Sequence, residues 1–165
     1  MSKTLLLLRH AKSSWNHPSL NDFERPLNER GERSAPRVGR LLTELGIVPE
    51  RALVSAAVRA RQTAEKVLAA CDFHGRVWGT GRLYLADPQT YLEVLALNAA
   101  EENCVLLVGH NNGIEQLASQ LSGKEILMPT ACLVQFDVSV AHWAEIHGVR
   151  KWALKGVWRV KELDN

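Results

Sequence analysis

The sequence has few cysteines, no long apolar run and no cluster of basic residues. Its three cysteines are an odd number and form no Cys-x-x-Cys pair, which argues against a disulfide framework and against the usual zinc and redox motifs. The four leucines that begin at Leu5 stop at Arg9, so this run is too short for a signal peptide or a membrane helix. We therefore expect a cytoplasmic protein with free thiols.

The chain also lacks the charge pattern of a protein that binds nucleic acid or a membrane surface. Its net charge is only +2, and its basic residues form no run that would make a binding groove or a tail. With 165 residues, 46% of them hydrophobic, and no repeat, the chain is expected to fold as one globular domain. Neither nucleic acid nor a membrane is an expected partner.

Two apolar runs in the chain end in the same way. Residues 5–8 lead to Arg9 and His10, and residues 105–108 lead to Gly109 and His110. A short continuous apolar run is typical of a strand that is covered on both faces, as in a parallel sheet flanked by helices. Each histidine would then stand at the carboxyl end of its strand. Because ligands bind at that edge of such sheets, we expect both imidazoles in one shared site.

Strand and helix patterns alternate between and after these runs, with a long ordered loop over residues 13–28. We expect an α/β fold: a three-layer, doubly wound, mostly parallel sheet with helices on both faces. The expected elements are a helix from Glu29 to the stop signal at Gly46, a strand over 51–55, a helix from Ala56 or Ala57 to Ala70, a strand at 77–78, a helix starting at Asp87-Pro88, a strand over 104–109 and a helix starting near Asn112.

The C-terminal part departs from this alternation. Strands are expected over residues 131–138, 143–146 and 149–161, and a turn at His147-Gly148 makes the last two a C-terminal β-hairpin. In the final strand, apolar residues alternate with Lys and Arg. This pattern predicts a half-exposed strand with Trp152 and Trp158 on the same face.

The arginines are concentrated before residue 62, and two of them fall at the start of an expected helix. Arg59 and Arg61 would face the positive end of the helix dipole, which costs about 0.3–1 kcal/mol each. A bound anion would remove this penalty, and the free amides of the helix after His110 would favour the same ligand. We expect one electropositive pocket that combines Arg9, His10, Arg59 and His110.

Three motifs resemble the histidine phosphatase (phosphoglycerate mutase-like) superfamily. They are Leu-Leu-Arg-His at the first strand, Ser-x-x-x-Arg-Ala-x-Gln-Thr-Ala over residues 55–64 and Val-Gly-His-Asn over residues 108–111. Their order and spacing match over essentially the whole chain, so residues 1–165 are expected to be a single histidine phosphatase domain. Leu-Arg-His-Ala-Lys-Ser at 8–13, and Arg-Pro-Leu at 25–27 followed by Arg30-Gly31, are most similar to the SixA-type phosphohistidine phosphatase branch.

The resemblance implies a role for each residue of the pocket. His10 would be the nucleophile that takes the phosphoryl group, Arg9 and Arg59 would clamp its equatorial oxygens, and His110 would donate to the same group. Phosphoryl transfer depends mostly on positioning and charge stabilisation, so fixed cations suit this chemistry and no metal or other cofactor is expected. An imidazole nucleophile would split hydrolysis into two steps through a phosphohistidine.

Two further residues are candidates for substrate binding. Asn16 stands where members of the family often place an asparagine that contacts phosphate, and the hydroxyl of Ser13 would also reach it; a purely structural role in the loop is the alternative for both. The chain has Ala11 where most members have glycine, and we expect little effect from its methyl group. A solvent-facing side chain is expected for Lys12.

The chain also departs from the mutase-type members of the family, which carry a catalytic glutamate in an insertion. Tyr84, Asp87 and Glu93 are the local options here, and Asp87 is more simply a helix cap. A phosphate ester benefits from a general acid by roughly 10²–10⁴-fold. The nitrogen of phosphohistidine leaves more easily, so a missing acid favours that substrate.

Three functions stay open at this point. The first is a metal-independent phosphatase acting on phosphohistidine of a signalling protein, such as a histidine-containing phosphotransfer domain. The second is a phosphomonoesterase for a small phosphorylated molecule, and the third is a regulatory module that binds phosphoryl groups without turnover. We favour the first, because all four pocket residues are present and a short loop in place of a lid would admit a phosphorylated protein.

Overall fold

The strands that precede the two histidines lie side by side in the middle of one mixed sheet. The computed structural model describes residues 2–160, and the strand order is β3-β2-β4-β1-β5-β6. The first four strands of the chain are mutually parallel, whereas β5 runs antiparallel to both of its neighbours. The strands are β1 (Lys3–Arg9), β2 (Arg51–Ser55), β3 (Arg76–Thr80), β4 (Cys104–Gly109), β5 (Leu133–Val138) and β6 (Ala153–Trp158). The predicted α/β fold with a mostly parallel sheet is confirmed.

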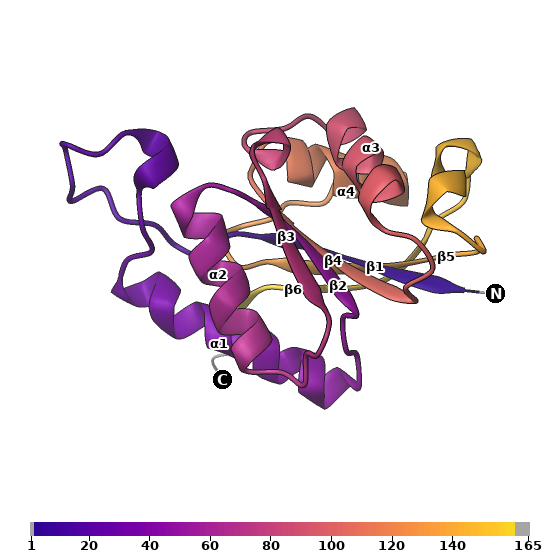
Figure 1. The fold of residues 1–165 in the computed structure, drawn as a ribbon, viewed down its shortest axis with the longest axis horizontal. Helices are drawn as coiled ribbons and strands as arrows, with labels where there is room; N and C mark the ends of the chain where they lie inside the picture. The colour runs from indigo at the N-terminus through magenta and orange to yellow at the C-terminus, as the bar shows by residue number, and fades with distance from the viewer. Residues whose placement is uncertain (1, 161–165) are drawn as a thin grey trace.

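Helices cover both faces of this sheet, as expected. Figure 1 shows α1 (Glu29–Leu45) and α2 (Val58–Ala69) on one face and α3 (Pro88–Asn98) and α4 (Gly113–Ser122) on the other. Short 3₁₀ helices lie in the connections: η1 (Asp22–Glu24), η2 (Gly81–Leu83) and η3 (Trp143–Gly148). The helix boundaries agree with the predicted ones to within one or two residues.

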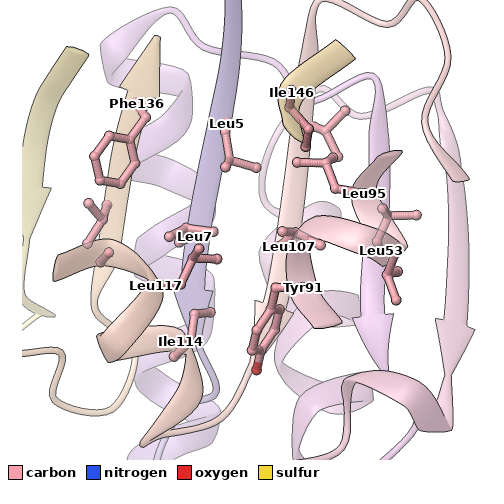
Figure 2. Packing of buried hydrophobic residues seen from close by; sticks show 14 of the residues in the cluster. Leu5, Leu7, Leu53, Tyr91, Leu95, Leu107, Ile114, Leu117, Phe136 and Ile146 are labelled. Carbon is pink, nitrogen blue, oxygen red and sulfur yellow. The ribbon is translucent and has the colours of Figure 1, made fainter. Parts of the chain in front are cut away.

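The alternation of side chains along β1 explains its unbroken apolar run. Leu5 and Leu7 point into the core under α3 and α4, where Figure 2 shows them packed against Ile114 and Leu117. Leu6 and Leu8 point into the opposite core, under α1 and α2. All four leucines are fully buried, and each such burial contributes roughly 1.5–3 kcal/mol. The strand is therefore a rigid support for whatever stands at its end.

Local capping signals set the helix ends that the sequence predicted. The Asn28 side chain accepts a hydrogen bond from the Gly31 amide at 2.9 Å, and α1 ends at Gly46 in the left-handed conformation, with φ of 69°. In α3, the Asp87 carboxylate accepts from the Thr90 amide at 2.9 Å, and Pro88 occupies the first position. Asp87 thus serves as a helix cap.

The strand predicted over residues 143–146 is wrong, because this segment is the 3₁₀ helix η3. Trp143 and Ile146 are both buried against α3, and a spacing of three residues places them on one side of a 3₁₀ turn. The Trp143 indole donates to the Glu102 carbonyl at 2.7 Å, and the Glu145 carboxylate accepts from the His142 amide. The final strand therefore does not pair with this segment. The antiparallel C-terminal strands are nevertheless present, because β6 pairs with β5.

The final strand, β6, pairs with β5 and is shorter than the predicted 149–161; Lys161 lies outside the described residues. A β-bulge falls opposite Gln135 and Phe136, where the pairing skips Lys155. One extra residue reverses which face the following side chains occupy. Trp152 consequently packs in the core under α3 and α4, whereas Trp158 packs in the opposite core. The prediction that these tryptophans share a face is wrong.

Gly31 lets α1 approach the start of the long loop. Its Cα lies so close to the Lys12 carbonyl that an added Cβ would clash with that oxygen, which already accepts from the Asn28 amide. We predict that Gly31→Ala lowers the free energy of unfolding by about 1–3 kcal/mol, the usual cost of overpacking. Urea unfolding is the measurement, with Gly148→Ala as the control, because nothing lies near a Cβ at Gly148. Equal stability of the two variants would contradict this packing.

Candidate active site

The two histidines are the first residues beyond two adjacent parallel strands. Arg9 in β1 pairs in register with Gly109 in β4, and the His10 amide donates to the Gly109 carbonyl at 3.1 Å. The parallel register therefore brings His10 and His110 to the same height at the carboxyl edge of the sheet. Their ring centroids are 5.1 Å apart. The imidazoles lie in one place, as their strands predicted.

A cavity of about 220 Å³ opens at this edge. Arg9, His10, Arg59 and His110 all line it, and so does Ser13. The exposed Lys12 also lies at its wall. The remaining lining residues are Trp15, Arg25, Leu85, Asn111 and Thr130.

Asn16 is not among the residues that line this cavity. It lies at a neighbouring hollow beside Ser14 and His17, and its own amide donates to the Ser14 hydroxyl. Asn16 therefore does not line the cavity that holds His10 and Arg59. The physical reason is that the chain turns back after Ser14, whose amide donates to the Pro26 carbonyl at 2.8 Å, and Asn16 lies beyond that turn.

The environment of His10 determines the state of its imidazole. Nδ1 lies 2.7 Å from the Ala11 carbonyl oxygen, which can only accept, so Nδ1 carries the proton and donates. Burial, together with the positive charges of Arg59 and Arg9, lowers the pKa of His10 to about 4. The ring is therefore neutral at pH 7. Its Nε2 atom keeps a free lone pair, as a nucleophile requires.

His110 is held from two sides and is also neutral. Its Nε2 lies 2.8 Å from the hydroxyl oxygen of Ser55, the last residue of β2, and its backbone amide donates to the Tyr91 hydroxyl. Burial lowers the pKa of His110 to about 3, with neighbouring His10 and Arg59 contributing. Three adjacent strands, β1, β4 and β2, thus each contribute a polar group at one edge of the sheet.

Buried polar atoms without a partner are concentrated around this cavity. Within residues 2–160, five buried side-chain nitrogen or oxygen atoms make no hydrogen bond, and four of them belong to residues that line it: Arg9 Nε, Arg59 Nε, His110 Nδ1 and Asn111 Oδ1. An unsatisfied buried polar group costs about 1–3 kcal/mol. Such a group in a folded protein requires an explanation, and a bound oxyanion would satisfy the guanidinium donors.

Asp22, in the loop between β1 and α1, is the hydrogen-bonding centre behind the cavity. Its Oδ1 accepts from Arg25 Nε and Nη2 at 3.1 and 3.0 Å, and its Oδ2 accepts from Arg59 Nη2 at 2.9 Å and from the Tyr84 hydroxyl at 2.5 Å. Its carbonyl also accepts from Arg59 Nη1. Partial burial raises the pKa of Asp22, but the hydrogen bonds from Tyr84, Arg59 and Arg25 outweigh this and hold it well below its usual range. The carboxylate is ionised and orients Arg59.

Comparison with known proteins agrees with this geometry. Residues 5–79 match the histidine phosphatase superfamily (branch 1). An uncharacterised chloroplastic protein of Arabidopsis thaliana is 33% identical over 169 residues, covering 95% of this chain and 78% of its own length. The chain belongs to the histidine phosphatase superfamily.

Solved structures place it near SixA proteins within that superfamily. A protein assigned as phosphohistidine phosphatase SixA from Agrobacterium tumefaciens has 29% identity and a TM-score of 0.79, with 95% of this chain and 98% of that chain covered. The one from Nakamurella multipartitia has 23% identity and a TM-score of 0.85, with 96% of each chain covered. The protein histidine phosphatase SixA complexed with tungstate has the same fold, at 17% identity and a TM-score of 0.81 over 98% of this chain and 99% of that chain.

The superfamily also contains mutases, and one of them matches part of this chain. The 2,3-bisphosphoglycerate-dependent phosphoglycerate mutase of Leifsonia xyli is 42% identical over 79 residues, which are 47% of this chain but only 30% of the mutase. The mutase therefore has a large part that has no counterpart in this match.

None of the three acid candidates is among the residues that line the cavity. Asp87 is exposed and caps α3, and Glu93 accepts from Arg82 at 2.9 Å on the surface. Tyr84 lies closer, with its ring packed edge-on against His110 at 5.5 Å, but its hydroxyl donates to Asp22. Within residues 2–160, no group of three His, Cys, Asp or Glu is arranged to hold a metal ion.

Sequence reasoning missed Asp22, Arg25 and Ser55. Ser55 could have been found, because it ends a buried strand adjacent to the one that leads to His110. The available signal for Asp22 was its place three residues before Arg25, in a part of the chain that is rich in arginines.

Ala11 raises no steric problem, because its methyl group packs in the core under α1 and α2 and its amide donates to the Thr63 hydroxyl.

The buried neutral histidines should make the protein sensitive to acid. In the unfolded chain they titrate near 6.5, but in the folded chain near 4 for His10 and near 3 for His110, so the unfolded state binds more protons below pH 6.5. The contribution of the two neutral histidines to the free energy of unfolding is therefore fully present above pH 6.5, and it is lost as the pH falls toward 4. We predict a decrease in the free energy of unfolding of about 1.4 kcal/mol per pH unit for each histidine.

Urea unfolding at pH 7, 6 and 5 measures this dependence. His10→Gln should reduce its slope by about half, whereas His17→Gln, a change at an exposed position in the same loop, should leave it unaltered. A free energy of unfolding that stays constant from pH 7 to pH 5 in the unaltered protein would contradict the neutral, buried state of both rings.

Proposed function

We propose that this histidine phosphatase is a metal-independent enzyme that removes phosphate from phosphohistidine on a signalling protein, through a covalent intermediate on His10. One observation carries the proposal. The neutral His10 imidazole, with its proton on Nδ1, lines the same cavity as Arg9, Arg59 and His110. In these three residues, Arg9 Nε, Arg59 Nε and His110 Nδ1 are buried and have no partner among the described residues. Phosphoryl transfer requires a nucleophile aligned with fixed donors for the equatorial oxygens, and this arrangement supplies both.

The charges around the cavity suit a phosphoryl dianion. Arg9, Lys12, Arg25 and Arg59 carry four positive charges, the Asp22 carboxylate neutralises one of them, and both histidines are neutral. The cavity therefore keeps an excess of positive charge that attracts a dianion. Burial strengthens this attraction relative to that in water. A neutral or monoanionic ligand would leave part of this charge unbalanced.

In the first step, the lone pair of His10 Nε2 forms a bond to phosphorus while the P–N bond of the substrate breaks. The substrate imidazole, protonated on its other nitrogen, keeps the electron pair of that bond and leaves as a neutral ring. No further proton is needed. The phosphorylated His10 ring carries its own proton on Nδ1, where the Ala11 carbonyl already accepts it. Charge is conserved because one protonated phosphoimidazole replaces another.

In the second step, water attacks phosphorus and the P–N bond to His10 breaks. The electron pair returns to Nε2, and both protons of the water leave on the dihydrogen phosphate that forms. The donors around the cavity hold the oxygens in both steps, so the same groups serve each transfer.

The absence of a free carboxylic acid at the cavity wall, within the described residues, favours phosphohistidine over a phosphate ester. An alkoxide leaving group gains roughly 10²–10⁴-fold from a general acid. Asp22 is ionised and bonded to two arginines, while Asp87 and Glu93 face solvent. A small-molecule phosphomonoesterase is the second candidate, because Tyr84 places a phenolic hydroxyl near His110 and part of the chain is similar to a mutase.

The proposal extends to the organisation and setting of the protein. We propose that residues 1–165 form one histidine phosphatase domain, and that its partner is a phosphorylated protein such as a histidine-containing phosphotransfer domain. A cytoplasmic location is proposed because the three cysteines are unpaired, as is usual in a reducing compartment. No helix in the described part of the chain is long and apolar enough to span a membrane.

Trapping the intermediate tests the nucleophile. Mixing the protein with a ³²P-labelled phosphohistidine protein and quenching without acid should leave a base-stable label on His10. His10→Ala should lose the label and roughly 10³-fold or more of turnover, since removal of a nucleophile leaves little catalysis. His17→Ala, which alters an exposed histidine of the same loop, is the matched control. Undiminished labelling in His10→Ala would exclude the mechanism.

The substrate class needs a separate comparison. The phosphohistidine protein and a panel of phosphate esters should be hydrolysed side by side, and kcat/KM should be highest for phosphohistidine. Equal or faster turnover of a small ester would select the phosphomonoesterase. Binding of phosphate with no turnover of any substrate would select the non-catalytic module.

Arg59 and Arg61 provide a matched pair for testing the anion site. Both lie at the start of α2, but Arg59 lines the cavity whereas Arg61 donates to the Ala56 carbonyl at the surface. We predict that Arg59→Gln weakens binding of tungstate about 10-fold or more, as expected for losing a charge-assisted hydrogen bond, and that Arg61→Gln binds normally. Isothermal titration calorimetry measures both, and similar affinities for the two variants would contradict the assignment.

A further inference from the structure

Trp15 is a large apolar side chain at the mouth of the cavity that the chemistry on His10 does not use. It is 73% exposed, yet it lines the same cavity as His10 and Arg59. The guanidinium carbon of Arg25 lies over its ring, 3.5 Å from the centroid. One face of the indole is therefore covered by Arg25, and the high exposure leaves the other face open to solvent.

Arg25 is fixed, and it fixes the indole in turn. This arginine is only 8% exposed, and it donates to the Ser13 hydroxyl at 2.7 Å, to the Ser14 carbonyl at 3.2 Å and to Asp22. A guanidinium with this many partners has little freedom to move. The cation–π contact thus presents a pre-positioned aromatic face, which loses little further entropy when a ligand binds.

Leu85 is a second exposed apolar side chain on the cavity wall. It is 56% exposed and its φ is 50°, a left-handed conformation that a leucine rarely adopts. It lies between η2 and α3, on a different segment from Trp15, and both side chains line the one cavity. Neither side chain is buried in a core, so both can contact a ligand that enters the cavity.

We propose that Trp15 and Leu85 bind the leaving group, and that the leaving group is a flat aromatic heterocycle, the imidazole of phosphohistidine. This inference rests on the proposed function and identifies the part of the substrate that the arginines do not hold. An imidazole ring joined to phosphorus extends from the phosphoryl site toward the mouth of the cavity, where it can stack on the open indole face and contact the Leu85 side chain. Aromatic stacking of this kind favours a ring over an aliphatic leaving group.

Two substrates with the same scissile bond test this inference. A phosphohistidine peptide and phosphoramidate both contain a P–N bond, but only the peptide has an aromatic ring. Trp15→Ala should lower kcat/KM for the peptide about 10-fold and leave kcat/KM for phosphoramidate within about 2-fold, while Trp15→Phe keeps most of the activity on the peptide. Leu85→Ala should act in the same direction with a smaller effect. Leu97→Ala, which removes another exposed leucine, on α3 and outside the cavity lining, should have none.

Each other outcome has a definite meaning. An equal loss on both substrates in Trp15→Ala would overturn the inference and make the indole a support for Arg25. No loss on either substrate would overturn it as well. The dissociation constant for inorganic phosphate serves as a control. An unchanged value in Trp15→Ala would show that the substitution leaves the anion site intact. If the unaltered protein forms no phosphorylated His10 and cleaves neither P–N substrate, the proposed function fails first, which is distinguishable from a loss of ring selectivity alone.

Discussion

The hydrogen bond from His10 Nδ1 to the Ala11 carbonyl, made in a buried place, is the interaction on which the site depends. It fixes the tautomer, and burial keeps the ring neutral, so the Nε2 lone pair is available at pH 7. Both the tautomer and the neutral state of the ring depend on where β1 places His10. Because this strand is covered on both faces, it holds the following residues away from water, and its register with β4 sets His110 beside His10. The neutral state of the His10 imidazole is thus a consequence of core packing.

The same burial creates an electrostatic cost that the protein offsets in part. The three arginines near the two imidazoles would repel one another without a counter-charge. Asp22 supplies this counter-charge, because its carboxylate accepts hydrogen bonds from both Arg25 and Arg59. Three buried nitrogens, Arg9 Nε, Arg59 Nε and His110 Nδ1, have no hydrogen-bond partner among the described residues. A fold with two well-packed cores tolerates a few such groups, each costing about 1–3 kcal/mol. The proposed binding of a phosphoryl dianion would give them partners. The loop that carries Asp22 also carries Trp15, so one segment links the anion site to the cavity mouth.

The fold was largely predictable because its signals are local. The apolar runs before His10 and His110, the Asn28 and Asp87 caps and the Gly46 stop depend on neighbouring residues alone. The prediction failed where distant contacts decide. Trp143 lies in a 3₁₀ turn in which its indole donates to the backbone carbonyl of Glu102, 41 residues earlier in the chain. The bulge at Lys155 depends on how β6 pairs with β5.

The residues at the cavity also divide into those marked by local sequence signals and those placed by distant contacts. Arg9, His10, Arg59 and His110 were found because each stands at an element end that the pattern marks. The positions of Asp22 and Asn16 could not be predicted for a single reason: both lie in a loop whose path is set by the turn at Ser14 and by the arginines that it contacts. Sequence spacing carries no information about such a path, since loop conformation follows from contacts with other segments.

The most direct test of this account is the protonation state of the His10 imidazole, measured by ¹H–¹⁵N nuclear magnetic resonance of the two ring nitrogens between pH 7 and pH 5. We expect one neutral tautomer throughout this range, with the proton on Nδ1 and an unprotonated Nε2 whose signal shifts when phosphate is added. A proton on Nε2 at pH 7, or a ring that becomes doubly protonated near pH 6.5, would contradict it.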